Sequence, residues 1–242
     1  MATVGHPLDL WSMKKCVLLL SGGLDSATTL AIAKSQGYVV SALSFDYGQR
    51  HSVELDSAKK VAAAMGVTDH RVAKIDLRIF GGSALTSDLE VPHGDDPMSR
   101  SEIPITYVPA RNTVFLSFAL AMAETIGAFD IFIGANQVDY SGYPDCRGEY
   151  LDAFAAMANL ATAASVEGRG TFSIQAPLLD LTKDQIIQRG LQLGVPYELT
   201  ISCYDPIDGK ACTTCDSCQI RRSAFAKLNL SDPAPSIRGY DG

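Results

Sequence analysis

The amino-acid sequence predicts an α/β fold, with a doubly wound, mainly parallel sheet and a zinc-binding segment near its C-terminal end. Short apolar segments alternate along the chain with segments of helical length, which is typical of a parallel sheet. A glycine-rich turn follows the first apolar segment, and four cysteines crowd into residues 203–218. These features indicate a nucleotide-binding domain followed by a metal-binding segment.

The expected strands are short and apolar, and a segment of helical length follows each of them. They cover residues 16–20, 38–45, 70–75, 131–135 and 172–175. The expected helices cover residues 26–36, 52–65, 111–126, 148–164 and 182–193, and several end near a glycine. We expect residues 1–200 to form the nucleotide-binding domain. Residues 201–242 are expected to form a zinc-binding segment and a tail packed on that domain, with residues 231–242 poorly ordered.

A loop inserted at about residues 80–105 interrupts the alternation of strands and helices. This stretch contains several glycines and prolines, shows no sustained periodicity and is long for a connection. Two interpretations have equal weight, a mobile lid over an active site and a solvated surface excursion.

Composition and charge limit the classes of function. The 242 residues are 47% hydrophobic and 19% charged, which is ordinary for a soluble protein with a substantial core. A net charge of −7 and a pI near 5.0 disfavour direct binding of nucleic acid, which needs clustered Lys and Arg. No apolar stretch approaches the roughly 20 residues that span a bilayer, and residues 1–15 do not resemble a signal peptide. We therefore expect a cytoplasmic protein with no membrane partner.

The turn that follows the first expected strand has the character of a phosphate-binding loop. Gly22 and Gly23 can take backbone angles closed to other residues and carry no Cβ that would block a phosphate. The following helix adds its partial positive charge beneath the loop. An ordinary glycine turn is the alternative, but the strand, Ser-Gly-Gly, Asp-Ser and the helix together favour a nucleotide. The candidate ATP contacts are Leu20, Ser21, Gly22, Gly23, Leu24, Asp25, Ser26, Ala27, Thr28 and Arg111.

Further polar side chains follow the expected strands at the edge of the sheet where ligands bind in open α/β folds. Residues 45–51 and 134–147 form two dense polar runs that can line a planar, polar ligand. Arg111 can hold a phosphate or carboxylate through two parallel hydrogen bonds. Lys183 either reaches a phosphate or is a solvated helix residue. Asp25 either contacts phosphate through a bridging Mg²⁺ or holds the loop.

Four cysteines have the spacing of a structural metal site. Cys203, Cys212, Cys215 and Cys218 are separated by eight, two and two residues, which lets four thiolates surround one tetrahedral ion. An iron–sulfur cluster is the rival, but the next ligand of the ferredoxin run falls at Arg222, and the fourth cysteine lies upstream instead. Structural zinc is therefore favoured over a cluster or free thiols.

These runs, in this order, carry a close resemblance to the 7-cyano-7-deazaguanine (preQ0) synthases. This family belongs to the PP-loop ATP pyrophosphatases, whose fold is described as adenine nucleotide α-hydrolase-like, and the resemblance covers nearly the whole chain. Ala110 and Thr213 depart from the pattern, because the family usually has glycine at both positions. The matching runs are SGGLDS at 21–26, FDYGQRH at 45–51, VPARN at 108–112, YSGYPDCR at 140–147, SCY at 202–204 and CDSC at 215–218.

The resemblance implies an ATP-dependent ligase that converts 7-carboxy-7-deazaguanine and ammonia into the nitrile through an acyl adenylate and an amide. It implies structural zinc, Mg²⁺ with ATP, and a homodimer. The implied catalytic residues are Asp25, Ser26, Arg111 and Lys183. The implied substrate residues are Asp46, Tyr47, Gln49, Arg50, His51, Asp139, Tyr143, Asp145 and Arg147. Within this set, Arg147 is the candidate for the substrate carboxylate, and Asp139 or Asp145 for ring N–H groups.

Three alternatives remain at this point. A PP-loop RNA thiolase or tRNA-modifying ligase shares the nucleotide loop, although the acidic balance counts against it. A related deazaguanine enzyme would stop at the amide or attach its substrate to a macromolecule. A nucleotide-binding regulatory or zinc-stabilised interaction protein would use the same loops for recognition only.

Overall fold

The predicted α/β fold is confirmed by a computed structural model of the chain, which describes residues 14–49, 53–87, 89–93, 103–136 and 143–237. Its sheet has five parallel strands in the order β3-β2-β1-β4-β5. The chain winds outward from β1 to β3, returns across β1 and continues to β5, so the winding direction reverses between β1 and β4. The strands are β1 (Lys15–Leu19), β2 (Val39–Asp46), β3 (Asp69–Lys74), β4 (Asp130–Phe132) and β5 (Ser173–Gln175).

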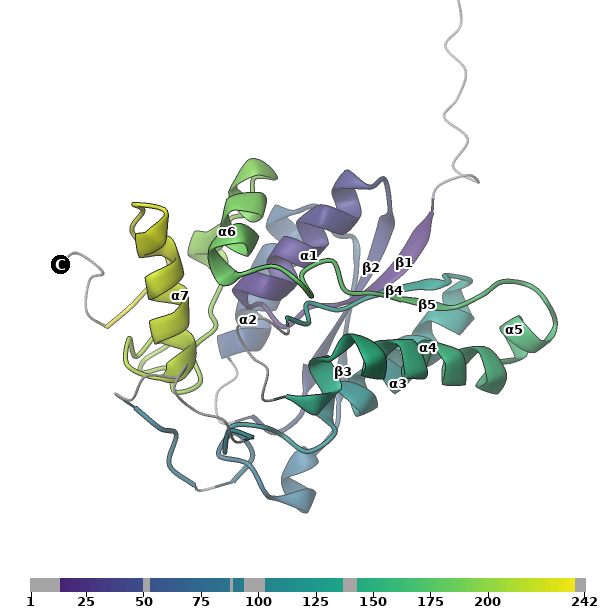
Figure 1. The fold of residues 1–242 in the computed structure, drawn as a ribbon, viewed down its shortest axis with the longest axis horizontal. Helices are drawn as coiled ribbons and strands as arrows, with labels where there is room; N and C mark the ends of the chain where they lie inside the picture. Colours follow the sequence, from purple (N-terminus) through teal and green to yellow (C-terminus); the bar gives the residue numbers. More distant parts are fainter. Residues whose placement is uncertain (1–13, 50–52, 88, 94–102, 137–142, 238–242) are drawn as a thin grey trace, which may run out of the picture.

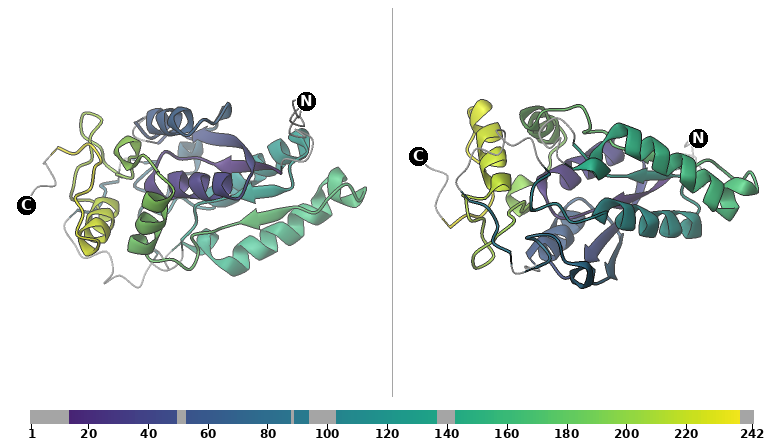
Figure 2. Two further views of the ribbon diagram at one scale, coloured as in Figure 1. Left: turned by 90° about the horizontal axis from the view of Figure 1, so that it is seen from above. Right: turned by 60° about the horizontal axis from the view of Figure 1, so that its bottom comes forward.

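Helices cover both faces of the sheet (Figures 1 and 2). The alternation of side chains along β1 explains this layering, because successive residues point to opposite faces. Val17 and Leu19 lie in the core shared with α3 and α4, whereas Cys16 and Leu18 lie in the core shared with α1, α2 and α6. The α-helices are α1 (Leu24–Ser35), α2 (Val53–Ala64), α3 (Arg111–Ile126), α4 (Gly148–Ala161), α5 (Ala163–Val166), α6 (Lys183–Gln192) and α7 (Asp216–Lys227).

Several boundaries differ from the sequence-based expectation. The helix expected at 148–164 is interrupted at Thr162, whose extended backbone (φ −106°, ψ 140°) separates α4 from α5. The strand expected at 131–135 is only three residues long and shifted toward Asp130. Helix α7 was not anticipated, because the cysteine spacing dominates its sequence and its apolar residues are few. No helix within the described ranges has the length and apolar content needed to cross a membrane.

The expectation that residues 231–242 are poorly ordered is wrong for the described part of this tail, residues 231–237. Arg221 of α7 and Asp232 form a buried bidentate ion pair, with Nε–Oδ2 and Nη2–Oδ1 distances of 2.7 and 2.9 Å. The same guanidinium donates to Thr200 Oγ1 at 2.8 Å and to the Tyr197 carbonyl oxygen at 3.1 Å. Because each polar group has a partner, this buried charge anchors the tail and α7 to the domain.

The inserted loop is also packed where the structure describes it. It begins in the 3-10 helix η1 (Leu77–Phe80), and the backbone N–H of Ala84 donates to the carbonyl of Ile105 at 2.9 Å. Leu85 and Val91 are buried in the core on the α3 side of the sheet. These contacts count against a solvated excursion for the described part of the loop.

Candidate active site

The glycine-rich turn lies against α2, and this contact explains why Gly22 is glycine. Its φ of +85° is in the left-handed region. A Cβ at this position would lie 2.4 Å from the carbonyl oxygen of Glu54 and 2.5 Å from the backbone nitrogen of Ala58. Only a residue without a side chain allows so close an approach of two backbones.

Two serines brace the loop internally. Ser26 Oγ donates to the carbonyl oxygen of Gly23 at 3.1 Å and accepts from the backbone N–H of Ser21 at 3.2 Å. The two hydroxyl oxygens lie 3.0 Å apart. A distant segment also holds the loop, since Ser202 Oγ accepts from the N–H of Leu24 at 3.1 Å and the N–H of Ile201 donates to Gly22 O at 3.0 Å. The loop shape therefore depends on residues far along the chain.

Two of the residues predicted to contact ATP, Ala27 and Thr28, are instead buried in the core. Thr28 is fully buried, and its Oγ1 donates to the carbonyl of Leu24 at 2.9 Å and lies 2.7 Å from the hydroxyl of Tyr197. Ala27 is also fully buried in the core on the α1 side of the sheet. The geometry assigns both residues to packing of α1, and neither of them lines the pockets described below.

Asp25 and Lys183 form an ion pair at the start of two helices. Lys183 Nζ lies 2.9 Å from both carboxylate oxygens of Asp25, and the lysine side chain is 12% exposed. The interpretation of Lys183 as a solvated helix residue is therefore wrong. A capping box of Thr182 and Gln185 fixes the start of α6 and so the position of the lysine.

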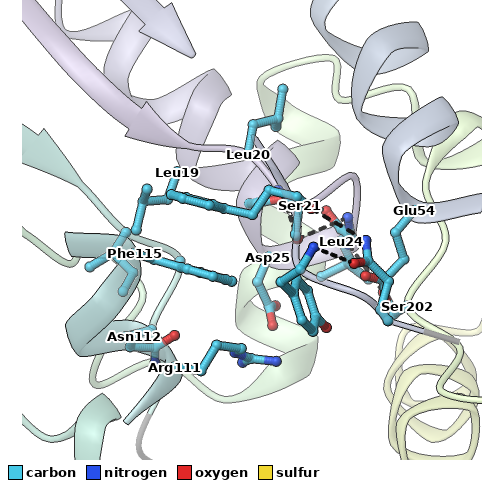
Figure 3. Close-up of a pocket in the computed structure, with 18 of the residues that line it drawn as sticks. Leu19, Leu20, Ser21, Leu24, Asp25, Glu54, Arg111, Asn112, Phe115 and Ser202 are labelled. Atoms are coloured by element: carbon cyan, nitrogen blue, oxygen red, sulfur yellow. Dashed lines mark hydrogen bonds between the residues drawn. The ribbon is translucent and has the colours of Figure 1, made fainter. Parts of the chain in front are cut away.

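Arg111 begins α3 and lies opposite the loop (Figure 3). Its guanidinium carbon is 6.0 Å from the ring centre of Phe115, which supports the charge through a cation–π contact. The preceding Ala110 has a left-handed backbone (φ 53°, ψ 24°), and Thr213 in the cysteine loop also has a positive φ of 70°. Both departures from the family's glycines thus keep the backbone conformation that glycine adopts most easily.

Two adjoining pockets lie at the edge of the sheet formed by the carboxyl ends of the strands. The larger has a volume of about 240 Å³ and extends from the loop to the aromatic side chains of Phe45, Tyr47 and Phe115. The smaller, of about 160 Å³, contains Lys183 and Tyr143. Both are lined by Asp25, Arg111, Ser202, Tyr204 and Ser217 among others.

The first turns of five helices line these pockets. Asp25 is in the first turn of α1, Glu54 of α2, Arg111 of α3, Lys183 of α6 and Ser217 of α7. Each helix N-terminus carries a partial positive charge that favours an anion. With Arg111 and Lys183 added, the site can hold a polyphosphate.

The predicted substrate residues are distributed unevenly around the pockets. Tyr47 and Gln49 line the larger pocket, and Tyr143 lines the smaller one. Asp46 and Arg147 do not line either pocket, and Arg147 is exposed at the start of α4. Arg50, His51 and Asp139 lie outside the described residues.

Asp145 supports α3 and is not among the residues that line the pockets. Its Oδ2 accepts from the N–H of Asn112 at 3.0 Å, and its carbonyl oxygen accepts from Asn112 Nδ2 at 3.1 Å. Burial raises the pKa of Asp145, whereas the hydrogen bond from the N–H of Asn112 and the nearby charge of Arg111 oppose this shift. The carboxylate satisfies a backbone N–H at the helix start and thereby fixes the position of Arg111.

Sequence reasoning missed several pocket residues, of which Glu54 is the most distinctive. It lies in the first turn of α2 and lines the larger pocket. Burial raises its pKa to about 7, and the positive charge of Arg111 opposes this shift. The sequence signal that could have identified Glu54 as a site residue is its position just after the polar run at residues 45–51. Ser202 and Tyr204 were recognised as part of a family motif, but their place in the pocket was not anticipated.

The four cysteines form a buried cluster beside the pockets. Their Sγ atoms all lie within 4.8 Å of one another, with Cys203–Cys215 and Cys212–Cys218 distances of 3.9 and 4.0 Å. A tetrahedral zinc ion with bonds of about 2.3 Å places its sulfurs about 3.8 Å apart. Backbone N–H groups of Cys212 and Cys215 donate to Sγ atoms at 3.2 and 3.3 Å, which favours thiolates. The donor set therefore fits a metal ion such as zinc.

Comparison with known families decides the classification of the chain. The model of the family described as "Queuosine biosynthesis protein QueC" matches residues 15–229. The chain belongs to the QueC family. It is 63% identical to the 7-cyano-7-deazaguanine synthase of Paramagnetospirillum magneticum, with 92% of this chain and 98% of that protein covered. The synthase of that name from Desulfatibacillum aliphaticivorans is 62% identical, with 93% and 97% covered.

A solved structure supports the fold of this QueC family member. NMN synthetase from Francisella tularensis aligns with a TM-score of 0.51 at 17% sequence identity. The alignment covers 91% of this chain and 79% of the synthetase. At this level of identity the likeness concerns the fold alone.

Proposed function

We propose that the protein is a 7-cyano-7-deazaguanine synthase that converts 7-carboxy-7-deazaguanine and ammonia into the nitrile at the expense of ATP. The observation that carries this proposal is the convergence of five helix starts, Arg111 and Lys183 on the glycine-rich loop, within a chain so similar to proteins of that name. The proposed site combines a place for phosphates with an aromatic surface that suits a flat heterocycle.

The carboxylate must be activated by ATP, because oxide is too poor a leaving group for ammonia to displace it directly. A carboxylate oxygen attacks the α-phosphorus of ATP and displaces pyrophosphate, and ammonia then displaces AMP from the acyl adenylate to give an amide. A second ATP activates the amide oxygen, and loss of AMP leaves the nitrile. Arg111 is placed to stabilise charge on the α-phosphate or the substrate carboxylate, because it lines both pockets.

The phosphate side of the reaction uses the loop and the Asp25–Lys183 pair. Ser21 and Ser26 hold the loop in shape, and Lys183 neutralises charge beside it. Mg²⁺ would neutralise phosphate charge, and the Asp25 carboxylate, 33% exposed at this edge, is the group that would hold it. A zinc ion held by the four cysteines would take no part in these steps, because four thiolates would complete its coordination.

The proposal extends to the cellular location and oligomeric state of the enzyme. We place it in the cytoplasm as a homodimer with small-molecule substrates. Leu160 and Val166, which are 83% and 74% exposed on α4 and α5, offer an apolar surface to a second copy.

Product analysis by mass spectrometry tests the proposed function. The purified protein is incubated with 7-carboxy-7-deazaguanine, ATP, Mg²⁺ and ammonium, and each component is omitted in turn as a control. Nitrile formed together with AMP and pyrophosphate supports the proposal. Amide as the final product indicates the truncated reaction, and absence of turnover in a folded, zinc-loaded preparation refutes the assignment.

We expect replacement of Lys183 by methionine to lower kcat/KM for ATP by roughly 100-fold. The variant removes a buried positive charge and leaves the Asp25 carboxylate beside the phosphates, so it weakens binding of the polyanion in both ground and transition states. Lys59→Met is the matched control, since Lys59 is 60% exposed and pairs only with exposed Asp56 in the described structure. Equal kinetics for the two variants would contradict the assigned role of Lys183.

A further inference from the structure

Formation of a nitrile from ammonia requires the loss of every N–H proton. Ammonia brings three hydrogens and the nitrile nitrogen has none, so three protons leave that nitrogen during the proposed reaction. One leaves when the amide forms, one when the amide oxygen is adenylylated, and one when AMP departs. This loss of protons rests on the proposed function, and it requires a proton acceptor close to the reacting carbon.

Few of the described pocket residues can accept a proton near neutral pH. Asp25 pairs with Lys183 at 2.9 Å and is the proposed ligand for Mg²⁺. Burial raises the pKa of Tyr47 to about 12 and that of Cys146 to about 11, so both remain protonated. No histidine is among the described residues that line either pocket. The remaining carboxylate is that of Glu54.

The position of Glu54 is set by the phosphate loop itself. Its backbone carbonyl is the atom that a Cβ at Gly22 would meet at 2.4 Å, so the start of α2 is packed directly against the loop. Figure 3 shows Glu54 and Ser202 on one side of the loop, with Arg111 across the pocket. The titratable and charged groups around the carboxylate are Tyr47 after β2, Tyr204 of the C-terminal segment and Arg111 of α3.

We propose that Glu54 is the general base of nitrile formation. Its carboxylate takes a proton from the attacking nitrogen as the C–N bond forms and AMP leaves. It takes the second proton as the amide oxygen bonds to the α-phosphorus of the second ATP and pyrophosphate leaves. The third proton is taken as the C–O bond to AMP breaks and the C≡N bond forms. Glu54 returns each proton to water between steps.

The raised pKa of Glu54 suits this role. A group with a pKa of about 7 is half ionised at neutral pH, which balances the fraction of active base against its strength. Arg111 opposes the shift, so an anionic substrate that pairs with Arg111 would increase the basicity of Glu54 further.

The test separates carboxylate activation from loss of nitrogen protons. Substrate-dependent exchange of labelled pyrophosphate into ATP reports the acyl adenylate and needs no base, whereas amide and nitrile formation do. For Glu54→Gln we expect exchange within about threefold of wild type and ammonia-dependent product formation at least about 100-fold slower. Asp56→Asn is the matched control, because it makes the same change on α2 at a side chain that is 62% exposed.

The pH profile supplies a second readout. At a fixed concentration of free ammonia, the wild-type rate of amide formation should fall about tenfold per pH unit below about 7, where Glu54 becomes protonated. Glu54→Gln should lack this fall, and Glu54→Asp should keep it with a reduced rate. Melting curves confirm that the variants are folded.

Each contrary result has a distinct meaning. Equal losses of exchange and product formation in folded Glu54→Gln would assign Glu54 to binding and overturn the proposal, as would wild-type product formation. If wild-type protein performs neither exchange nor nitrile formation with 7-carboxy-7-deazaguanine, the proposed function itself fails and this inference fails with it.

Discussion

Replacing Cys215 with serine is expected to abolish stoichiometric zinc binding and to lower the melting temperature by more than about 10 °C. Cys215 is fully buried, its Sγ lies 3.9 Å from that of Cys203, and it caps the start of α7. Loss of one thiolate leaves the other ligands without their ion. Because metal binding and folding of such a segment are coupled, the free energy of unfolding falls by several kcal/mol.

The same variant should also weaken ATP binding, although Cys215 lines neither pocket. Ser202 holds the glycine-rich loop through the N–H of Leu24, and it adjoins Cys203 of the four-cysteine cluster in the chain. A loosened cysteine segment therefore releases one support of the loop. We expect the Kd for ATP to rise at least about tenfold, which corresponds to about 1.4 kcal/mol.

Metal analysis, thermal melting and ATP titration on the same preparations test this prediction. Cys16→Ala is the matched control, since Cys16 is fully buried in β1 but is not part of the four-cysteine cluster. It should lose some stability as a core truncation while it retains about one zinc ion per chain and normal ATP affinity. A wild-type preparation stripped of zinc that melts and binds ATP normally would refute the structural role of the metal.

Gly22→Ala is expected to remove ATP binding almost completely, whereas Gly37→Ala should be tolerated. Both glycines have positive φ, +85° and +83°, so both variants incur a similar backbone cost of about 1–2 kcal/mol. Only Gly22 faces a neighbour, because its new Cβ would meet Glu54 O and Ala58 N at 2.4 and 2.5 Å. Around Gly37 no atom lies within 4 Å. The loop must therefore shift away from α2 in Gly22→Ala alone.

Isothermal titration with ATP and denaturant unfolding measure the two effects separately. The difference between the variants isolates the steric contact from the backbone strain that they share. We expect Gly22→Ala to lose at least roughly 3 kcal/mol of stability and at least about 100-fold in ATP affinity. Equal stability and equal ATP affinity of the two variants would contradict this prediction, because they would mean that α2 moves aside without affecting either quantity.

Local sequence patterns were sufficient to predict the structure of several parts of this protein. The strand at β1, the glycine-rich turn and the start of α1 follow one another within a dozen residues, and backbone chemistry decides their shape at short range. The cysteine spacing likewise placed four sulfurs in one cluster, because short separations leave few other arrangements. The expected start of a helix at Arg111 is likewise confirmed, because Arg111 begins α3.

Other features depend on contacts that no local pattern contains. Thr28 points to Tyr197 across 169 residues of sequence, and Ser202 reaches the loop across 178. Asp145 holds the start of α3, although its sequence context suggested contact with substrate.

The sequence by itself determined the type of fold, the glycine-rich loop between β1 and α1, and the cluster of four cysteines, since these depend on periodicity and spacing within short segments. The tertiary structure alone decided which polar side chains face the pocket and which support it. A side chain's direction depends on the elements that pack around it, and those elements come from distant parts of the chain. For the same reason, the place of Glu54 in the larger pocket and its raised pKa follow only from the packing of α2, α3 and the loop.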